Sequence, residues 1–408
     1  MKKTNKILGA SLLGLAAAMG GVSTSMAADV AVTSTTSTDA TNLATTNDPV
    51  YATDGAYGSV LTGGATTIAL DVVTVTESGT LYFEDDNGGG DLTMASIAVS
   101  TDKTFTILLG AEDDGTEGTK NPVASVLGAV TGGGSIAVNA WDNGVATNSG
   151  GAGTIEFAGA MTLSALTIES GDGGAANAGA TLTVTDIGTG SDALAITTMT
   201  LQAGDGSDAN KAGGLLTITE MAGDITGTTY TIVGGQGGDS GSGAGGGAGG
   251  EVQVDLHAGD ITSVTTVNLG SGAGGAGAGN ATAAGIGGVL DINAWGGAVV
   301  AATTMNVYTG NGGAGGAGAD GGAGGASEIV DIGNAGIAVT TLNVYTGNGG
   351  DGLVNVAAGD GGNGGAHAIT DLGAITATTM NIYSGNAGTA GAGTTAAGGD
   401  SGQGGALV

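Results

Sequence analysis

A repeated segment constrains this chain more than any other feature. Each copy opens with Thr-Thr and then alternates apolar and polar residues, and the Thr-Thr pairs begin 31, 37, 38, 37 and 38 residues apart. A fixed period in this range indicates stacked structural repeats. The copies are TTMTLQ (197–202), TTYTIV (228–233), TTVNLG (265–270), TTMNVYTG (303–310), TTLNVYTG (340–347) and TTMNIYSG (378–385).

A second apolar segment precedes each Thr-Thr copy and follows a glycine tract. Its copies are TLTVTDIG (181–188), LLTITEMAGDI (215–225), EVQVDLHAGDI (251–261), VLDINAWGGAV (289–299), EIVDIGNAGI (328–337) and AITDLGAI (368–375). We therefore expect an all-β chain, a parallel β-solenoid of two-strand repeats with equivalent strands in register about 4.8 Å apart. No helix is expected in the mature chain, because no window has a 3.6-residue apolar period and glycine is abundant.

Side-chain alternation predicts the faces of the Thr-Thr strand. Thr303, Met305 and Val307 should share the inward side. Outward ladders of identical side chains, which interact favourably when stacked, should follow from the register. The ladders are a threonine column, a column in which Thr200 and Thr231 lead into asparagines, and a third column of Tyr308, Tyr345 and Tyr383. We identify the threonine and asparagine columns as a candidate ligand face. The threonine and asparagine members are Thr198, Thr229, Thr266, Thr304, Thr341 and Thr379, with Asn268, Asn306, Asn343 and Asn381.

The glycine tracts repeat every third residue, as in 310–325 and 347–365. Polyproline II has three residues per turn and no internal hydrogen bonds, so glycine at every third position leaves one face bare. We expect these tracts to stack as polyproline-II-like segments on one side of the solenoid, with the phase lost from Gly385 onward. Collagen is excluded, because it needs abundant proline and an uninterrupted run. The alternative is a set of flexible low-complexity loops.

The N-terminus has the features of a targeting segment. Lys2, Lys3 and Lys6 precede a short apolar run, and 25–27 fits a small-x-small cleavage site, so residues 1–27 are predicted to be a signal peptide rather than a membrane anchor. Residues 28–50 are predicted to be a Thr/Ser-rich linker, 51–134 an N-terminal β region that caps the solenoid, and 135–408 the glycine-rich repeats. Since another repeat is due at 404–408, we expect the chain to be the N-terminal piece of a longer protein.

The chain is strongly acidic. Its formal charge is −31, it has no cysteine, and only Lys103, Lys120 and Lys211 follow the signal segment. Nucleic acid and anionic membranes are poor partners for such a chain, and direct membrane insertion of the mature segment is not expected. Divalent cations are plausible ligands, and Ca²⁺ is the candidate.

Two groups of carboxylates are candidate calcium sites. The first is a loop cluster in FEDDNGGGD, comprising Glu84, Asp85, Asp86 and Asp91; the alternative is a solvated turn. The second is a predicted column, in which like charges would repel unless metal or water offsets them, or unless the residues sit at turns. Its members are Asp186, Glu220, Asp255, Asp291, Asp331 and Asp371.

Enzyme signatures are missing from the sequence. His257 and His367 are the two histidines, at non-equivalent strand ends, and neither has a partner set typical of a triad or zinc site. We interpret both as surface-exposed. The glycine-pattern matches, such as GGAGAD (315–320), carry no weight against this background. The protein is predicted not to be an enzyme, and a lyase or hydrolase on a solenoid is disfavoured because Lys211 is the one cation in the repeats.

The signal peptide, the cysteine-free acidic chain and the strand-plus-glycine repeats resemble the passenger regions of autotransporter adhesins and related bacterial β-strand-repeat surface proteins. The resemblance covers 1–27 and 135–408 and is architectural. It implies a β-solenoid stalk exported to the surface of a Gram-negative-type bacterium for adhesion or matrix building. The tracts also resemble those of Gly-Ala-rich mycobacterial surface proteins, without their helical N-terminal domain.

Two functions follow as expectations. The first is a non-enzymatic cell-surface structural protein, an adhesin stalk or extracellular matrix component. The second is a surface-adsorbing binding module for ice or polysaccharide that uses the outward Thr/Asn ladder. The expected partners are a host or abiotic surface, a polysaccharide, or further copies of the chain, since open strand edges favour self-association.

Overall fold

The computed structural model describes residues 30–32, 56–61, 67–76, 78–85, 91–110, 123–140, 153–173, 177–190, 192–207, 210–240, 245–278, 282–330, 336–354, 358–370, 373–392 and 399–407. Every regular element in these ranges is a strand, so they contain no helix that could cross a membrane. The predicted signal peptide over 1–27 and nearly all of the predicted linker over 28–50 lie outside the described residues.

The strands are short and evenly distributed. In chain order they are β1 (Val30–Val32), β2 (Ala56–Leu61), β3 (Thr67–Val75), β4 (Gly79–Asp85), β5 (Asp91–Val99), β6 (Thr104–Gly110), β7 (Val123–Val126), β8 (Val130–Thr131), β9 (Ser135–Ala140), β10 (Gly153–Phe157), β11 (Met161–Glu169), β12 (Leu182–Ile187), β13 (Ala193–Gln202), β14 (Leu216–Ile218), β15 (Asp224–Thr226), β16 (Thr229–Val233), β17 (Val252–Val254), β18 (Ile261–Thr262), β19 (Thr266–Gly270), β20 (Leu290–Ile292), β21 (Val299–Tyr308), β22 (Ser327–Ile329), β23 (Ile337–Tyr345), β24 (His367–Ile369) and β25 (Ile375–Tyr383).

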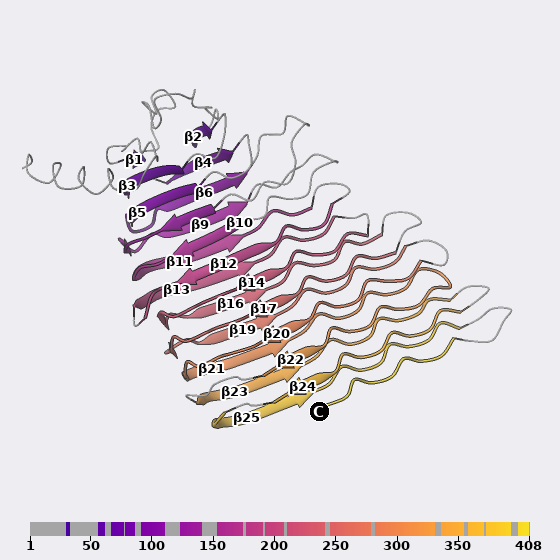
Figure 1. Cartoon of the computed structure of the whole chain (residues 1–408). Helices are drawn as coiled ribbons and strands as arrows, with labels where there is room; N and C mark the ends of the chain where they lie inside the picture. Colours follow the sequence, from indigo (N-terminus) through magenta and orange to yellow (C-terminus); the bar gives the residue numbers. More distant parts are fainter. Residues whose placement is uncertain are drawn as a thin grey trace, which may run out of the picture.

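All of these strands belong to one sheet, and every pairing between them is parallel. Figure 1 shows them stacked in layers from the N-terminal strands to β25. The prediction of an all-β chain with parallel pairing is confirmed for the described residues, and the strands between residues 56 and 131 continue into the same sheet as those that follow.

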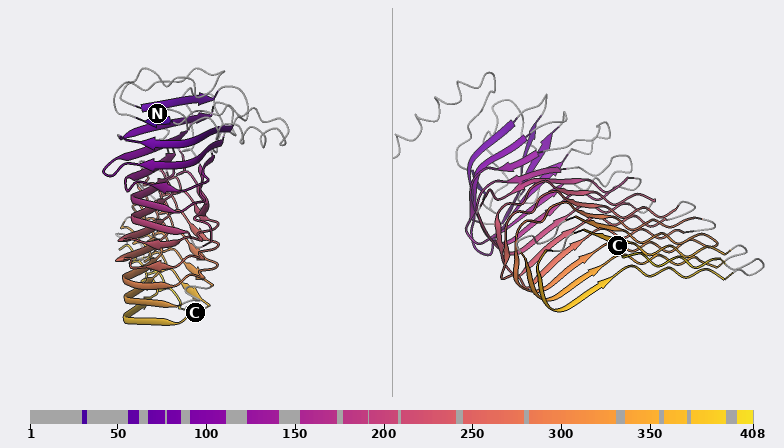
Figure 2. Two further views of the ribbon diagram at one scale, coloured as in Figure 1. Left: turned by 90° about the vertical axis from the view of Figure 1, so that its left-hand side faces the viewer. Right: turned by 60° about the horizontal axis from the view of Figure 1, so that its bottom comes forward.

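One layer illustrates the chain path, and we call each such layer a rung. β20 is followed by Trp295, then by the long strand β21, and then by a glycine tract that runs out and returns to β22. β21 pairs with β18 and β19 of the preceding rung and with β23 of the next. The right-hand view of Figure 2 shows the strands at one side and the glycine tracts extending from them as a stack of wavy segments.

Each long strand bends at the first residue of its Thr-Thr pair. Thr303 is exposed, whereas Ala302 and Met305 are buried, so the two-residue alternation breaks there. The amides of Thr303 and Thr304 both donate to the carbonyl of Thr265, at 3.1 and 3.0 Å, which marks the corner. The prediction that Thr303 faces inward with Met305 and Val307 is therefore wrong for Thr303 and correct for the other two.

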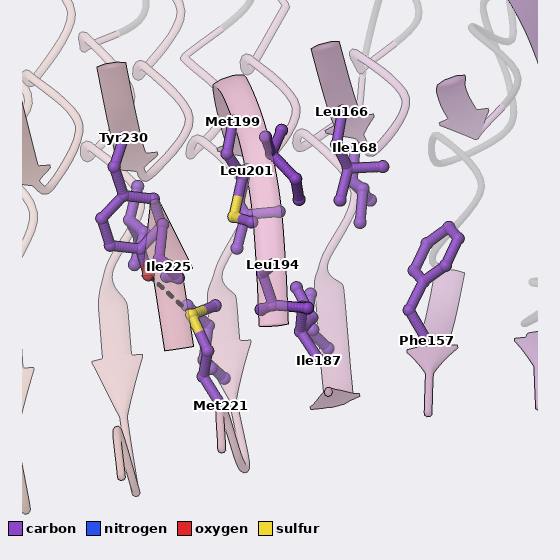
Figure 3. Packing of buried hydrophobic residues seen from close by; sticks show 14 of the residues in the cluster. Phe157, Leu166, Ile168, Ile187, Leu194, Met199, Leu201, Met221, Ile225 and Tyr230 are labelled. Atoms are coloured by element: carbon purple, nitrogen blue, oxygen red, sulfur yellow. Dashed lines mark hydrogen bonds between the residues drawn. The ribbon is translucent and has the colours of Figure 1, made fainter. Parts of the chain in front are cut away.

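The core is a set of inward columns that run through all rungs. In the rung of β20 and β21, Leu290, Ile292, Trp295, Val299 and Met305 are all fully buried. Figure 3 shows the same arrangement further up the stack, with Phe157, Leu166, Met199 and Tyr230 packed between strands. Because the apolar side chains pack against their equivalents above and below, a thin core is buried from β3 to β23, whereas the apolar residues of β25 are only partly buried or exposed.

The glycine tracts form an ordered second region, which we call the glycine wing. Each tract has an outgoing limb, such as 310–316, and a returning limb, such as 320–326. Amides of one limb donate to carbonyls of the other in a zigzag: Gly313 to Gly285 at 2.9 Å, Gly322 to Gly313 at 2.9 Å and Gly350 to Gly322 at 2.8 Å. A second set links like limbs of successive rungs, as in Gly312 to the carbonyl of Asn348 at 2.8 Å.

Close backbone approach explains the glycine period. A Cβ at Gly313 would lie 2.0 Å from the carbonyl oxygen of Gly275, and one at Gly312 would lie 2.0 Å from that of Gly322. Two residues of each triplet therefore face another limb, and the third, such as Ala314, is exposed. The three-residue period of the glycines needs to hold only within one limb. Gly385, Gly388 and the returning Gly402 make the same zigzag bonds, so the prediction that the pattern is lost from Gly385 onward is wrong.

Candidate binding face and its supporting ladders

The predicted threonine column is in register. Thr198, Thr229, Thr266, Thr304, Thr341 and Thr379 are paired in that order through successive parallel strands. The first five are half-buried and Thr379, on β25, is exposed. In the part of the chain that the structure describes, the hydroxyls of these threonines make no hydrogen bond with protein atoms. They are therefore available to solvent or to a ligand.

The asparagine column is also in register, and its side chains are linked into a ladder. The pairings run from Thr231 to Asn268, Asn306, Asn343 and Asn381. Nδ2 of each asparagine donates to the oxygen of the preceding side chain, with lengths of 3.4 Å to Thr231 Oγ1 and then 2.8, 2.8 and 2.9 Å along the asparagines. An amide holds two N–H groups and two lone pairs. Asn306 and Asn343 therefore each keep one free donor and one free acceptor.

A tyrosine column lies beside the asparagines in the last rungs. Tyr308, Tyr345 and Tyr383 are paired in register, and the rings of Tyr308 and Tyr345 stack with centroids 5.6 Å apart. Tyr345 is 40% exposed and Tyr383 is 61% exposed. The ring of Tyr308 lies over Gly270, where a Cβ would fall 2.2 Å from the ring. Burial raises the pKa of Tyr308 and Tyr345, so these phenols are neutral.

A further asparagine column was missed by the sequence analysis. Asn311, Asn348 and Asn386 are exposed on the outgoing limbs, just beyond the tyrosines. The Oδ1 of Asn311 accepts the backbone N–H of Asn348 at 2.8 Å, and Asn348 accepts that of Asn386 at 2.8 Å. This leaves the Nδ2 groups pointing to solvent. The available signal was the Asn that follows each Tyr-Thr-Gly or Tyr-Ser-Gly motif.

A buried hydroxyl ladder joins the strands to the glycine wing, and it was also missed. Ser271, Thr309 and Thr346 are each 3% exposed. Thr309 Oγ1 donates to the carbonyl of Gly325 and accepts the N–H of Gly347 at 2.8 Å, and Ser271 likewise donates to Gly288 at 2.6 Å and accepts from Gly310 at 3.1 Å. The signal was a hydroxyl residue directly before the first glycine of a tract. These threonines are structural, in contrast to the uncommitted Thr304 and Thr341.

The predicted carboxylate column is wrong for Asp255 and Asp291. The β-bridge from Ile187 to Met221 places Asp186 beside Glu220, but Asp291 pairs with Gln253 and Glu328 instead of Asp255. Asp255 Oδ1 accepts from Asn293 at 3.0 Å, and Asp331 and Asp371 lie outside the described residues. Burial, then repulsion from Glu220 and Glu156, raises the pKa of Asp186 to about 6.

The predicted calcium loop is only partly visible. Asp86 and the side chains of Glu84 and Asp85 lie outside the described residues, and Asp91 is half-buried at the start of β5. Asp91 pairs with Thr67 and Val123 in neighbouring strands. Among the described side chains, no group of three or more histidines and carboxylates could hold a metal ion. Calcium binding therefore stays a prediction.

Both histidines are buried, which overturns the expectation that they are exposed. His257 is 0% exposed and stacks on Trp295 with centroids 3.9 Å apart, and neither of its ring nitrogens has a hydrogen-bond partner among the described residues. Burial lowers the pKa of His257 to about 3. His367 is 1% exposed, and its Nδ1 lies 2.6 Å from Ser327 Oγ and its Nε2 2.9 Å from the carbonyl oxygen of Tyr383. Neither ring is accessible to a substrate.

Comparison of the chain with protein-family models, with curated proteins and with solved structures gave no match.

Proposed function

We propose that this protein is an exported, non-enzymatic structural protein of the bacterial cell surface, an adhesin stalk or a component of an extracellular matrix. The observation that carries the proposal is the continuity of the stack. Parallel pairing runs from β1 to β25, and the glycine wing adds backbone hydrogen bonds between successive rungs. Such an arrangement suits a stiff, extended body whose length follows the number of rungs.

In this proposal the chain is a parallel β-solenoid of two-strand repeats, with polyproline-II-like glycine segments as its second side. The threefold glycine period and the hydrogen bonds between limbs, with close backbone contact at every inward glycine, support that interpretation. Stability without disulfides then comes from stacked backbone hydrogen bonds and a thin apolar core. Those bonds suit a cysteine-free protein that works outside the cytoplasm of a Gram-negative-type bacterium.

The acidic chain supports the same role. A formal charge of −31 keeps copies soluble and disfavours nucleic acid and anionic membranes as partners. Partners of the proposed stalk are a host or abiotic surface, a polysaccharide or another copy of the chain. Ca²⁺ is the candidate ligand in this proposal.

The test is the intact mass and location of the protein in cells that make it. We expect a species that begins at residue 28, found on the cell surface or in the medium and accessible to added protease. A species that keeps residues 1–27 and stays in the cytoplasm would contradict export, and with it the structural role at the surface.

A second candidate function is a binding module that adsorbs ice or polysaccharide through the Thr/Asn face. The specific observation that favours it is the difference between two sets of hydroxyls. The hydroxyls of Thr309 and Thr346 are committed to backbone groups, whereas the hydroxyls of Thr304 and Thr341 make no hydrogen bond in the described structure. A row of uncommitted hydroxyls in register is suited to a repetitive partner.

A further inference from the structure

The outward columns of the last three long strands carry no charged side chain. Across β21, β23 and β25 and the start of the following limbs, the outward columns consist of the corner threonines, the inner threonines, the asparagines, the tyrosines and the wing asparagines. In the middle rung these are Thr340, Thr341, Asn343, Tyr345 and Asn348. We call this set, with its equivalents in the two flanking rungs, the neutral face. It carries no charged side chain, although the chain carries a net charge of −31.

The neutral face can both donate and accept hydrogen bonds. Asn343 uses one N–H on Asn306 and receives one from Asn381, so it has one donor and one acceptor left. Asn348 has its Oδ1 occupied by the amide of Asn386 and presents its Nδ2. Thr340 and Thr341 have free hydroxyls in the described structure. A partner must therefore both donate and accept at closely spaced points, as alcohol groups do and carboxylates or phosphates do not.

The exposure of the tyrosines distinguishes between two kinds of partner, a flat crystal surface and a flexible polymer chain. Tyr345 and Tyr383 are 40% and 61% exposed, whereas Thr341, Asn343 and Asn381 on the same two strands are half-buried, so the tyrosine side chains stand out from the inner threonine and asparagine columns. A rigid plane such as ice would rest on these rings and lose contact with the Thr and Asn columns. A polymer chain can instead lie along the columns, with its apolar C–H groups against the ring edges.

We propose that the neutral face binds an uncharged polysaccharide that lies along the stack, across the rungs of β21, β23 and β25. The sugar hydroxyls would bond Thr341, Asn343 and Asn348 and their equivalents, and the tyrosine column would form one wall. Anionic polysaccharides are excluded by the charge of the chain. This inference rests on the second proposed function and names its ligand class and its rungs.

The test is affinity gel electrophoresis of the full chain in gels that contain dextran, a soluble β-glucan or a galactomannan, with alginate as the anionic comparison. We expect retardation by at least one neutral polymer and none by alginate. Tyr345→Ala should weaken that binding about tenfold, Tyr345→Phe should keep most of it, and Thr340→Glu should abolish it. Thr226→Glu, on the exposed side of β15, adds the same charge elsewhere and should bind like the native chain.

Several outcomes would overturn the inference. These are no retardation by any neutral polymer, equal retardation by alginate, or unchanged binding by Tyr345→Ala and Thr340→Glu variants whose circular dichroism matches the native chain. If the chain instead inhibits ice recrystallisation and Thr304→Tyr removes that effect, the adsorbing role stands but the polysaccharide is wrong. None of these results bears on surface export, which the mass measurement tests separately.

Discussion

The strand-built side and the glycine wing of each rung are held together in different ways. In the strands, side chains such as Trp295 and Met305 are fully buried, and alternation sends polar residues outward. In the wing, the interior has almost no side chains, and carbonyl oxygens occupy the space where a Cβ would be. The strand side is therefore governed by side-chain volume, and the wing by backbone hydrogen bonds that need close approach. Substitutions in each region separate these two kinds of stability.

The largest expected effect is in the strand-built core. Trp295→Ala removes the largest fully buried side chain and leaves a cavity beside His257. We expect the free energy of unfolding to fall by about 3–5 kcal/mol. Urea denaturation followed by circular dichroism measures it. Trp295→Phe is the control, and its free energy of unfolding should fall much less. Equal losses for both variants would contradict a core whose stability depends on side-chain volume.

Acid should weaken the same core through His257. Its pKa falls from 6.5 to about 3 on folding, so below pH 6.5 the unfolded chain binds the additional proton and stability decreases until about pH 3. The expected loss between pH 8 and pH 4 is about 3 kcal/mol. Asp186, whose pKa is raised, acts in the opposite direction.

The contribution of His257 is isolated by comparing the native chain with His257→Phe over the same pH range. The variant should lose the part of the pH dependence that lies between pH 6.5 and 3. If both proteins have the same pH dependence, folding does not lower the pKa of His257, and the buried neutral state is wrong.

A single methyl group should disturb the wing. Gly313→Ala places a Cβ against the carbonyl of Gly275 and interrupts the zigzag bonds to Gly285 and Gly322. We expect the free energy of unfolding to fall by about 1–3 kcal/mol. This exceeds the gain of about 0.4–1 kcal/mol that alanine gives by restricting the unfolded chain. Hydrogen exchange of tract amides should become faster around residue 313. Ala314→Ser, at the neighbouring exposed position, should leave it unchanged, and fast exchange in the native chain would contradict an ordered wing.

The hydroxyl ladder should have an effect of about the same size as that of the wing glycine. Thr309→Val keeps the shape but leaves the carbonyl of Gly325 and the amide of Gly347 without their partner. Unpaired buried groups of this kind cost about 1–3 kcal/mol. Thr303→Val, at the exposed corner, should change the unfolding free energy by no more than about 0.5 kcal/mol. Equal effects would mean that the strands and the wing are not coupled through this ladder.

The register of the face was predictable because the sequence repeats its side chains at a nearly constant interval. Thr-x-Asn-x-Tyr in three successive copies permits one alignment that buries Met305 and Leu342 and places Met380 on the same side, and a slip of one residue would expose the two buried side chains. The glycine period was equally visible, because a bare face is needed wherever limbs approach at backbone distance. The prediction of the carboxylate column failed because the strand that precedes the Thr-Thr strand varies in length. It also has no residue that recurs at a constant position, as the Thr-Thr pair does.

The sequence by itself determined the strands, their parallel pairing and the columns on the Thr-Thr strand, since these follow from alternation and period. Tertiary structure alone decided what lies opposite each residue across a rung. It turned Thr303 outward at a corner, buried His257 between Met221 and Trp295, and used Thr309 for the backbone while leaving Thr304 free. The physical reason is that contacts across a rung join residues whose separation depends on tract length and bend angle, which no local pattern encodes.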